Sequence, residues 1–246
     1  MRLLTTGQLA AFRLAVGRVQ KIGDDRGYAH HAGIHGLPLP VYCTHNSPLF
    51  LAWHRAYLYF FEKALQDQVP GVTLPWWNWT KHHLEGIPGV YTRRRALNRV
   101  NPLFDAAIPP AGRRLPRETR TWRDPGPPGE LPTPNQIEQV LANNDFTTFQ
   151  LQLESWHGAV HMWVGGTMGD IAVAAYDPVF WAHHCMIDRL WYLWQLRHPG
   201  ANPPANLLGR ALPPFPMTVH DTLSTTSLGY DYAVGTTAAP GPGPHA

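Results

Sequence analysis

The chain has 246 residues and a formal net charge of +3, and 44% of its residues are hydrophobic and 15% charged. This composition excludes a disordered chain and supplies the core of a single domain of ordinary size. No stretch reaches the roughly 18 apolar residues of a membrane span, and the amino terminus lacks the apolar run of a signal peptide. We therefore expect a soluble protein without a membrane partner, either cytoplasmic or exported together with another protein.

Apolar periodicity predicts two helices in the first third of the chain. A threonine cap near the amino terminus opens a helix that is expected to end near Gly23. Residues 24–46 are rich in Gly, Pro and His and are predicted to be irregular. Ser47 and Pro48 then supply an N-cap and a proline at the first helical position, which predicts a helix over about 48–68.

The middle of the chain, residues 81–144, contains much of the proline and little periodicity. It is predicted to be a loop-rich excursion that holds at most short helices. Within it, residues 81–124 carry ten Lys and Arg against four Asp and Glu. Because no recognisable nucleic-acid-binding module accompanies this charge, we expect a solvated basic surface and no nucleic-acid partner.

Two further helices are predicted in the second half of the chain, over about 146–163 and 178–196, each opened by an acidic or amide cap. A strand-like piece follows at 215–223, and the Pro- and Gly-rich tail 236–246 is expected to be disordered. Together these elements predict a mainly α fold with a four-helix-bundle core, long irregular loops and little β structure. We expect it to form one domain over residues 1–235.

The 14 histidines are the unusual feature of the composition. His157 and His161 stand four residues apart on a predicted helix, so both imidazoles lie on one face and can share a metal ion. His54 lies on the apolar side of another predicted helix. His45 precedes that helix on the incoming loop and can fold back toward the same centre.

His183 and His184 are adjacent on the last predicted helix and point about 100° apart, so at most one of them readily faces a given interior point. With the other histidines, this pair indicates two metal ions with three imidazoles each. An imidazole set without carboxylates favours copper, zinc, iron or nickel over magnesium or calcium, and copper has the highest affinity in that series.

The spacing between Cys43 and His45 brings the sulfur within reach of the imidazole ring, so a thioether cross-link is conceivable. A free buried cysteine or a disulfide with Cys185 is the alternative at this point.

Several separated motifs, taken in order along the chain, resemble the two copper-binding regions of the tyrosinase family, which includes catechol oxidases and molluscan hemocyanins. They cover most of residues 28–197 outside the loop-rich excursion. Two accompanying segments, Leu74–Thr80 and Gly229–Tyr232, are similar to further motifs of the family. The motifs are His35-Gly36-Leu37-Pro38, Cys43-Thr44-His45, Phe50-Leu51-Ala52-Trp53-His54-Arg55, the segment from His157 to Gly166, and the segment from Asp177 to Arg189.

The resemblance implies a dinuclear type 3 copper centre with two copper ions as cofactors and dioxygen as co-substrate. His184 is taken in preference to His183 because the family uses the second histidine of the pair. His30 or His31 could replace His35, because the loop that follows His35 is shorter than is common in the family. The implied ligands are His35, His45 and His54 for one ion and His157, His161 and His184 for the other.

Two residues near these ligands carry further implications of the resemblance. Cys43 matches the form in which the family carries a thioether to the second histidine of the first set, here His45. Asp188, one turn after His184, is a candidate for orienting the helix or an imidazole. It could equally be the salt-bridge partner of a nearby arginine.

Four residues bear on the reaction. Glu154 resembles the family glutamate that holds a water as general base for monophenols, although it could be an ordinary helix acid. Gly158 stands where efficient monophenolases of the family often have asparagine. Met162 and Ile171 would border the substrate entrance or belong to the core.

The resemblance therefore implies an enzyme that oxidises o-diphenols to o-quinones with dioxygen, with monophenols or o-aminophenols as further candidate substrates. A reversible dioxygen carrier of the hemocyanin type is the alternative, but such carriers resemble longer units with a second domain over the copper pocket. A zinc hydrolase usually has a carboxylate base and fewer imidazoles per ion. A small phenolic substrate and a copper-loading chaperone are the candidate partners, and the oligomeric state stays open.

Overall fold

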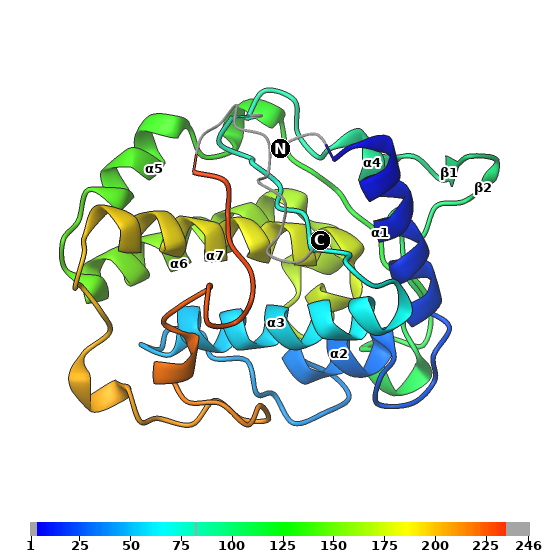
Figure 1. Cartoon of the computed structure of the whole chain (residues 1–246). Coiled ribbons are helices and arrows are strands. Elements are labelled where there is room, and N and C mark those ends of the chain that lie inside the picture. The colour runs from blue at the N-terminus through cyan, green and yellow to red at the C-terminus, as the bar shows by residue number, and fades with distance from the viewer. Residues whose placement is uncertain (1–3, 82, 235–246) are drawn as a thin grey trace.

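The structure is a computed structural model that describes residues 4–81 and 83–234 (Figure 1). Within the described residues, the two β-strands are β1 (Arg95–Ala96) and β2 (Arg99–Val100), which form a short antiparallel hairpin. The α-helices are α1 (Thr6–Val19), α2 (Tyr28–His35), α3 (Phe50–Gln68), α4 (Gly89–Thr92), α5 (Pro134–Leu141), α6 (Phe146–Val164) and α7 (Pro178–Arg197). The 3-10 helices are η1 (Pro110–Gly112), η2 (Pro128–Glu130), η3 (Gly166–Gly169), η4 (Ala174–Tyr176), η5 (Ala205–Leu207) and η6 (His220–Thr222).

Three long helices, α3, α6 and α7, contact one another and form the centre of the molecule, and α1 packs against α3 (Figure 1). The mainly α fold with little β structure is therefore confirmed. The four helices predicted from periodicity correspond to α1, α3, α6 and α7, with ends that differ by a few residues. The tail 236–246 lies outside the described residues.

The caps that open these helices follow from side-chain hydrogen bonds. The Thr5 side chain accepts from the backbone N–H of Gln8, and the Gln8 side chain closes a capping box. The Asp145 side chain accepts from Thr148 at the start of α6. At α7, Asp177 accepts from Val179 and a proline stands at the first helical position.

Two predictions of local structure are wrong. The segment 24–46 is not irregular throughout, because it contains α2, whose cap makes no side-chain hydrogen bond. Packing stabilises α2 instead: it contacts η4, and the Tyr28 hydroxyl donates to the carbonyl of Tyr176. The strand-like piece 215–223 makes one isolated bridge, Ala211 to Thr218, and then enters η6, because its apolar residues meet the bundle and no neighbouring strand.

Aromatic side chains fill the interior between the helices. Trp181 on α7 stacks on Phe61 of α3 with ring centroids 3.6 Å apart, and Trp194 stacks on Phe149 of α6 at 4.6 Å. These contacts join α7 to both of its neighbours. Such rings bury large apolar areas and prefer offset or edge geometries, so they define the spacing of the three helices.

A buried ion pair joins α3 to α7. Arg55 is 0% and Asp188 3% exposed, and the Nε of Arg55 donates to the Asp188 carboxylate. The hydroxyls of Tyr230 and Tyr232 donate to the other carboxylate oxygen at 2.7 Å each. The guanidinium lies 3.7 Å from the ring centroid of Trp191. Asp188 is thus the salt-bridge partner of an arginine, and because Arg55 lies on another helix the pair also helps to orient α7.

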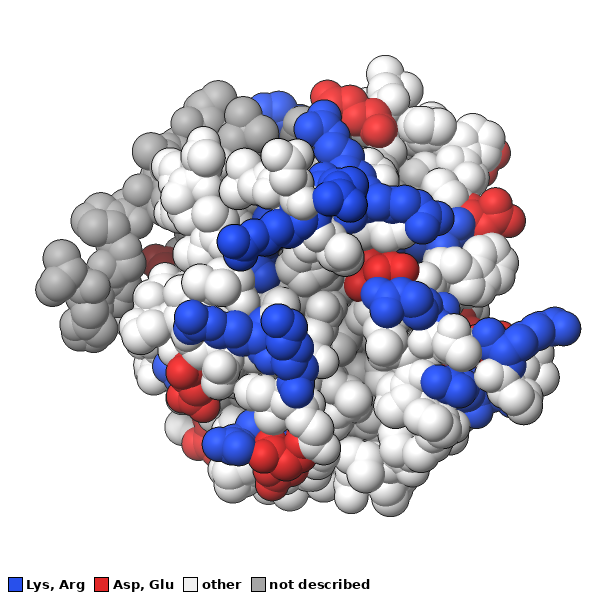
Figure 2. Space-filling view, turned by 90° about the vertical axis from the view of Figure 1, so that its right-hand side faces the viewer, with Lys and Arg blue, Asp and Glu red and all other residues white. Residues whose placement is uncertain are grey.

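Lys and Arg side chains gather on the face that contains α1 and the hairpin (Figures 1 and 2). Arg93, Arg94, Arg95 and Arg99 around the hairpin are exposed. Much of the basic excess in the loop-rich excursion therefore lies at the surface. None of the helices in the described residues is long and apolar enough to cross a membrane.

We expect Asp188→Asn to destabilise the fold by about 3–5 kcal/mol, because it leaves the Arg55 charge buried without its counter-ion. Urea unfolding of the metal-free protein measures this change. Glu138→Gln, which breaks the exposed pair with Arg197, is the control and should cost less than about 1 kcal/mol. If both variants lost the same free energy of unfolding, the buried pair would contribute no more to stability than the exposed pair.

Candidate metal centre

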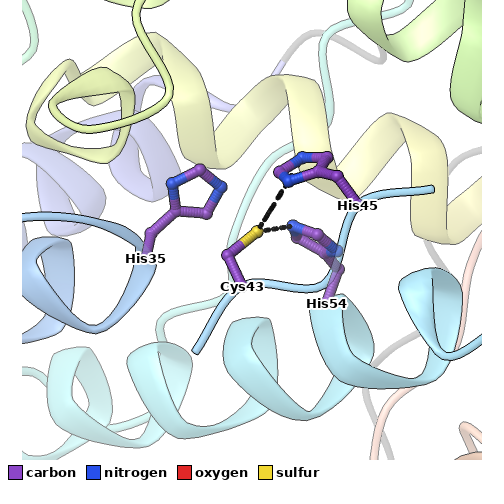
Figure 3. A group of neighbouring side chains, drawn as sticks. All are labelled: His35, Cys43, His45 and His54. Atoms are coloured by element: carbon purple, nitrogen blue, oxygen red, sulfur yellow. Dashed lines mark hydrogen bonds between the residues drawn. The ribbon is translucent and has the colours of Figure 1, made fainter. Parts of the chain in front are cut away.

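Three histidines and one cysteine converge from two helices and the loop between them (Figure 3). His35 ends α2 and His54 lies in the first turns of α3, while Cys43 and His45 come from the intervening loop. One nitrogen of each histidine and the sulfur all lie within 4.8 Å of one another. We call this set the first cluster.

The second cluster combines α6 and α7. His157 and His161 stand on one face of α6, and the paired His183 and His184 stand on α7. The Nε2 of His184 lies 3.3 Å from Nε2 of His157 and 3.1 Å from Nε2 of His161. Three Nε2 atoms that approach this closely could hold a cation between them.

The two clusters are neighbours. The ring of His54 stacks on that of His184 with centroids 4.6 Å apart, and the ring of His45 lies parallel to that of His157 at 5.5 Å. The helices α2, α3, α6 and α7 thus bring together residues that lie up to 149 positions apart in the sequence, from His35 to His184. Two ions held by these clusters would face each other.

Backbone carbonyls fix three of the rings. The Nδ1 of His35 lies 3.1 Å from the carbonyl of Ile171, and the Nδ1 of His161 lies 2.8 Å from the carbonyl of Met168. In α3, Nδ1 of His54 lies 2.8 Å from the carbonyl one turn before it. A carbonyl only accepts, so each Nδ1 carries the proton and each Nε2 is the nitrogen with the lone pair that can bind a metal ion.

Burial keeps these rings uncharged. Desolvation lowers the pKa of His45 and His161 to about 4 and that of His35, His54 and His184 well below the ordinary value. Neutral imidazoles are the form that binds metals. The buried Nε2 of His35 also has no hydrogen-bond partner in the described structure. The residues present therefore fit two ions of a metal that prefers nitrogen ligands, as copper does.

The structure places the alternative histidines differently. His183 stacks on His157 at 5.2 Å and approaches His161, but only its neighbour His184 also reaches the rings of the first cluster. His31 packs edge-on against Phe61, and among the described residues neither it nor His30 belongs to a group of converging ligand atoms.

Cys43 and Cys185 are both free thiols, so the disulfide alternative is wrong. The Cys43 sulfur lies 3.2 Å from Nδ1 and 3.8 Å from Nε2 of His45, at the ring edge that includes the carbon between them. It also lies 3.4 Å from Nε2 of His54.

A cavity of about 310 Å³ opens above both clusters. Met162 is 69% and Ile171 49% exposed, so both are rim residues and the core alternative for them is wrong. A Cβ placed on Gly158 would meet no atom within 4 Å, which leaves open space in this wall. The lining residues are His35, His45, Asn46, Glu154, His157, Gly158, His161, Met162, Met168, Gly169 and Ile171.

Glu154 is buried and uses one oxygen within the protein. Its Oε1 accepts the backbone N–H of Asn46 at 2.6 Å, whereas its Oε2 has no hydrogen-bond partner among the described residues. Burial raises the pKa of this carboxyl, and the bond from Asn46 partly offsets that rise. Such a group can hold a water in the cavity and accept a proton.

Sequence reasoning missed Asn46 and the segment from Met168 to Gly169. Asn46 follows His45 directly and has a left-handed backbone (φ 51°). No periodic pattern in the sequence predicts this conformation or the contact of its N–H. Met168 contributes through its carbonyl, which every residue type possesses. The one sequence signal for Asn46 was its position next to the candidate ligand His45.

Known proteins are similar to this chain over most of its length. The family model for the common central domain of tyrosinase matches residues 25–197. A tyrosinase of Streptomyces glaucescens is 37% identical over 227 residues, which cover 80% of this chain and 82% of that protein. A G-type hemocyanin of Enteroctopus dofleini is 31% identical over 263 residues, which cover 93% of this chain and 9% of that protein.

A solved structure of a functional unit from octopus hemocyanin matches with a TM-score of 0.81 at 30% identity, over 93% of this chain and 65% of that one. This chain therefore spans less than two thirds of the length of these hemocyanins. The family model covers well over half of the chain and includes the histidines of both clusters. The chain belongs to the type 3 copper tyrosinase family.

Proposed function

We propose that this protein is an oxidase that converts o-diphenols to o-quinones, with dioxygen as co-substrate. The observation that carries this proposal is the pair of facing histidine clusters beneath an open cavity. Each diphenol gives up two electrons and two protons, so two diphenols balance the reduction of one dioxygen to two water molecules. The proposed ligands are His35, His45 and His54 for one copper ion and His157, His161 and His184 for the other.

The copper ions, when bound, supply the redox chemistry, and the chain supplies position and shielding. The carbonyls that hold His35, His54 and His161 fix the direction of three ligands before any metal arrives. The side chains of Met168 and Ile171 give one part of the cavity an apolar lining. The cavity volume is near the lower end of the roughly 300–1,000 Å³ common for small-ligand sites, which suits a single substituted ring.

A reversible dioxygen carrier is the second candidate, because hemocyanins are similar to this chain at about the same identity as tyrosinases. Catalysis requires that a phenol reach the metal centre, whereas carriage requires only dioxygen. The exposed rim residues Met162 and Ile171 leave the described cavity accessible to a ring, which favours the oxidase.

We also propose monophenols as substrates. The protein would turn them over more slowly than diphenols. A monophenol must lose its hydroxyl proton before it can react, and Glu154 is the carboxyl in the cavity that can take this proton through a water. Gly158 offers no side chain to hold that water. We therefore propose that the proton is removed slowly in this protein.

We also propose a thioether between Cys43 and the carbon between the ring nitrogens of His45. The sulfur lies along that edge of the ring. The new C–S bond replaces an S–H and a C–H bond, and the two electrons and two protons released go to dioxygen. The cross-link would restrict rotation of the His45 ring.

We expect His161→Ala to reduce copper content and to slow oxygen uptake with 4-methylcatechol by more than about 100-fold, since even outer partners of metal ligands contribute about 10- to 100-fold. An oxygen electrode and elemental analysis provide the measurements. His220→Ala, at an exposed position, is the control and should behave like wild type. A wild-type protein that binds copper and dioxygen without consuming catechol would be a carrier.

We expect Gly158→Asn to raise the ratio of monophenol to diphenol turnover, because an amide there can hold a water beside Glu154. The gain can reach the roughly 10²-fold that a positioned base contributes. Gly209→Asn is the control, because a side chain there also meets no atom within 4 Å and the residue lies outside the cavity lining. If wild type already hydroxylates monophenols as fast as it oxidises diphenols, this role for Gly158 is wrong.

We expect the intact mass to fall by two hydrogen atoms when the reduced, copper-loaded protein meets dioxygen. Cys185→Ser should show the same change, whereas Cys43→Ser should not. High-resolution mass spectrometry of the whole chain and of its peptides decides the matter. An unchanged mass in fully copper-loaded wild type would rule out the thioether.

A further inference from the structure

The position of His45 depends on a loop. The other two histidines of the first cluster lie on helices and are held through Nδ1 by backbone carbonyls. His45 lies in the segment 36–49 between α2 and α3, which contains no helix or strand. The hydrogen-bond partner of its ring within the described residues is the sulfur of Cys43 in the same loop. Something outside the loop must therefore fix it.

Two side chains of α6 hold the backbone that directly follows His45. The N–H of Asn46 donates to Oε1 of Glu154 at 2.6 Å, and Nε2 of Gln150 donates to the carbonyl of Ser47 at 2.9 Å. Gln150 and Glu154 stand four residues apart, so both lie on one face of the helix. Both side chains are buried in α6, so few other conformations compete with the ones that make these bonds.

The same helix carries part of the second cluster. Positions 150, 154, 157 and 161 follow the spacing of a single helical stripe, so the face of α6 that holds the loop continues into His157 and His161. The rings of His45 and His157 lie 5.5 Å apart with an interplanar angle of 24°. A single rigid element thus sets the distance between a ligand of one cluster and the ligands of the other.

We propose that Gln150 and Glu154 form a clamp that positions His45, so that metal binding at the first cluster depends on α6. This inference rests on the proposed copper function and adds two positioning residues to it. The clamp uses Oε1 of Glu154, which leaves Oε2 for a water in the cavity, so the two roles of this residue are compatible. Gln150 does not line the cavity and acts only through the loop.

The chemistry of Gln150 fits a positioning role. The side chain is 1% exposed, and its Oε1 has no hydrogen-bond partner in the described structure. An unpaired buried acceptor costs free energy, so an apolar residue of the same length would suit the helix equally well or better. The donor bond to Ser47 is the contact that such a residue would lose.

The test is Gln150→Met, which keeps the side-chain length and removes the donor. We expect the metal-free variant to unfold at the temperature of wild type, while the more weakly held copper dissociates about 10- to 100-fold more readily, the range seen for groups that orient metal ligands. Copper retained per chain is measured against graded chelator. The control is Gln152→Met. Gln152 lies two residues from Gln150, and its side chain accepts a hydrogen bond from Asn143.

Glu154 provides an independent arm. Glu154→Gln keeps an oxygen for the Asn46 N–H and should retain copper, whereas Glu154→Leu should lose it as Gln150→Met does. Equal loss in the two Glu154 variants would mean that charge, and not the clamp, holds the metal. Unchanged copper retention in Gln150→Met would overturn the proposal outright.

A metal-free measurement separates this inference from the proposed function. Amide hydrogen exchange of residues 44–49 in the protein without copper should speed up in Gln150→Met and Glu154→Leu, and remain as in wild type in Gln152→Met and Glu154→Gln. Exchange that is equal in all variants contradicts the clamp. A wild-type protein that shows this exchange pattern but binds no pair of copper ions contradicts the proposed function alone.

Discussion

The structure depends on keeping a group of imidazoles uncharged in the buried interior between the helices. Desolvation disfavours the protonated rings, and crowding of several rings would add repulsion if more than one were charged. A neutral ring still has an N–H that must be bonded, and the chain satisfies this need at His35, His54 and His161 with backbone carbonyls. The protons thus point outward and the lone pairs inward, so the centre is ready for a metal before the metal binds.

This arrangement requires that α3 and α7 stay in register, and the ion pair between Arg55 and Asp188 contributes to that. Both charges are buried, and Tyr230 and Tyr232 complete the coordination of the carboxylate from the end of the described chain. Asp188 lies one turn from His184 and Arg55 is adjacent to His54, so each partner of the ion pair stands close to a proposed ligand. The pair therefore connects the helices at the level of the two clusters.

The sequence predicted what periodic side chains determine. Four long helices and the paired positions His157 and His161 follow from spacing, because helical geometry places residues four apart on one face. The helix α2 escaped prediction because packing on η4 stabilises it. The carbonyls that orient the rings and the N–H of Asn46 escaped as well, because main-chain groups are common to all residues. Gln150 gave no signal, since its importance depends on a loop more than 100 positions away.

One short segment links the pocket wall to both histidine clusters. The carbonyl of Met168 holds His161 in the second cluster, the carbonyl of Ile171 holds His35 in the first, and Met168, Gly169 and Ile171 all line the cavity. An exchange of side chains that leaves this backbone in place alters only the shape of the pocket. An insertion or deletion would move the carbonyls that hold His35 and His161 and so turn both rings at once. The shape of the pocket can therefore change by substitution, whereas the length of this segment is constrained by the two rings that its carbonyls hold.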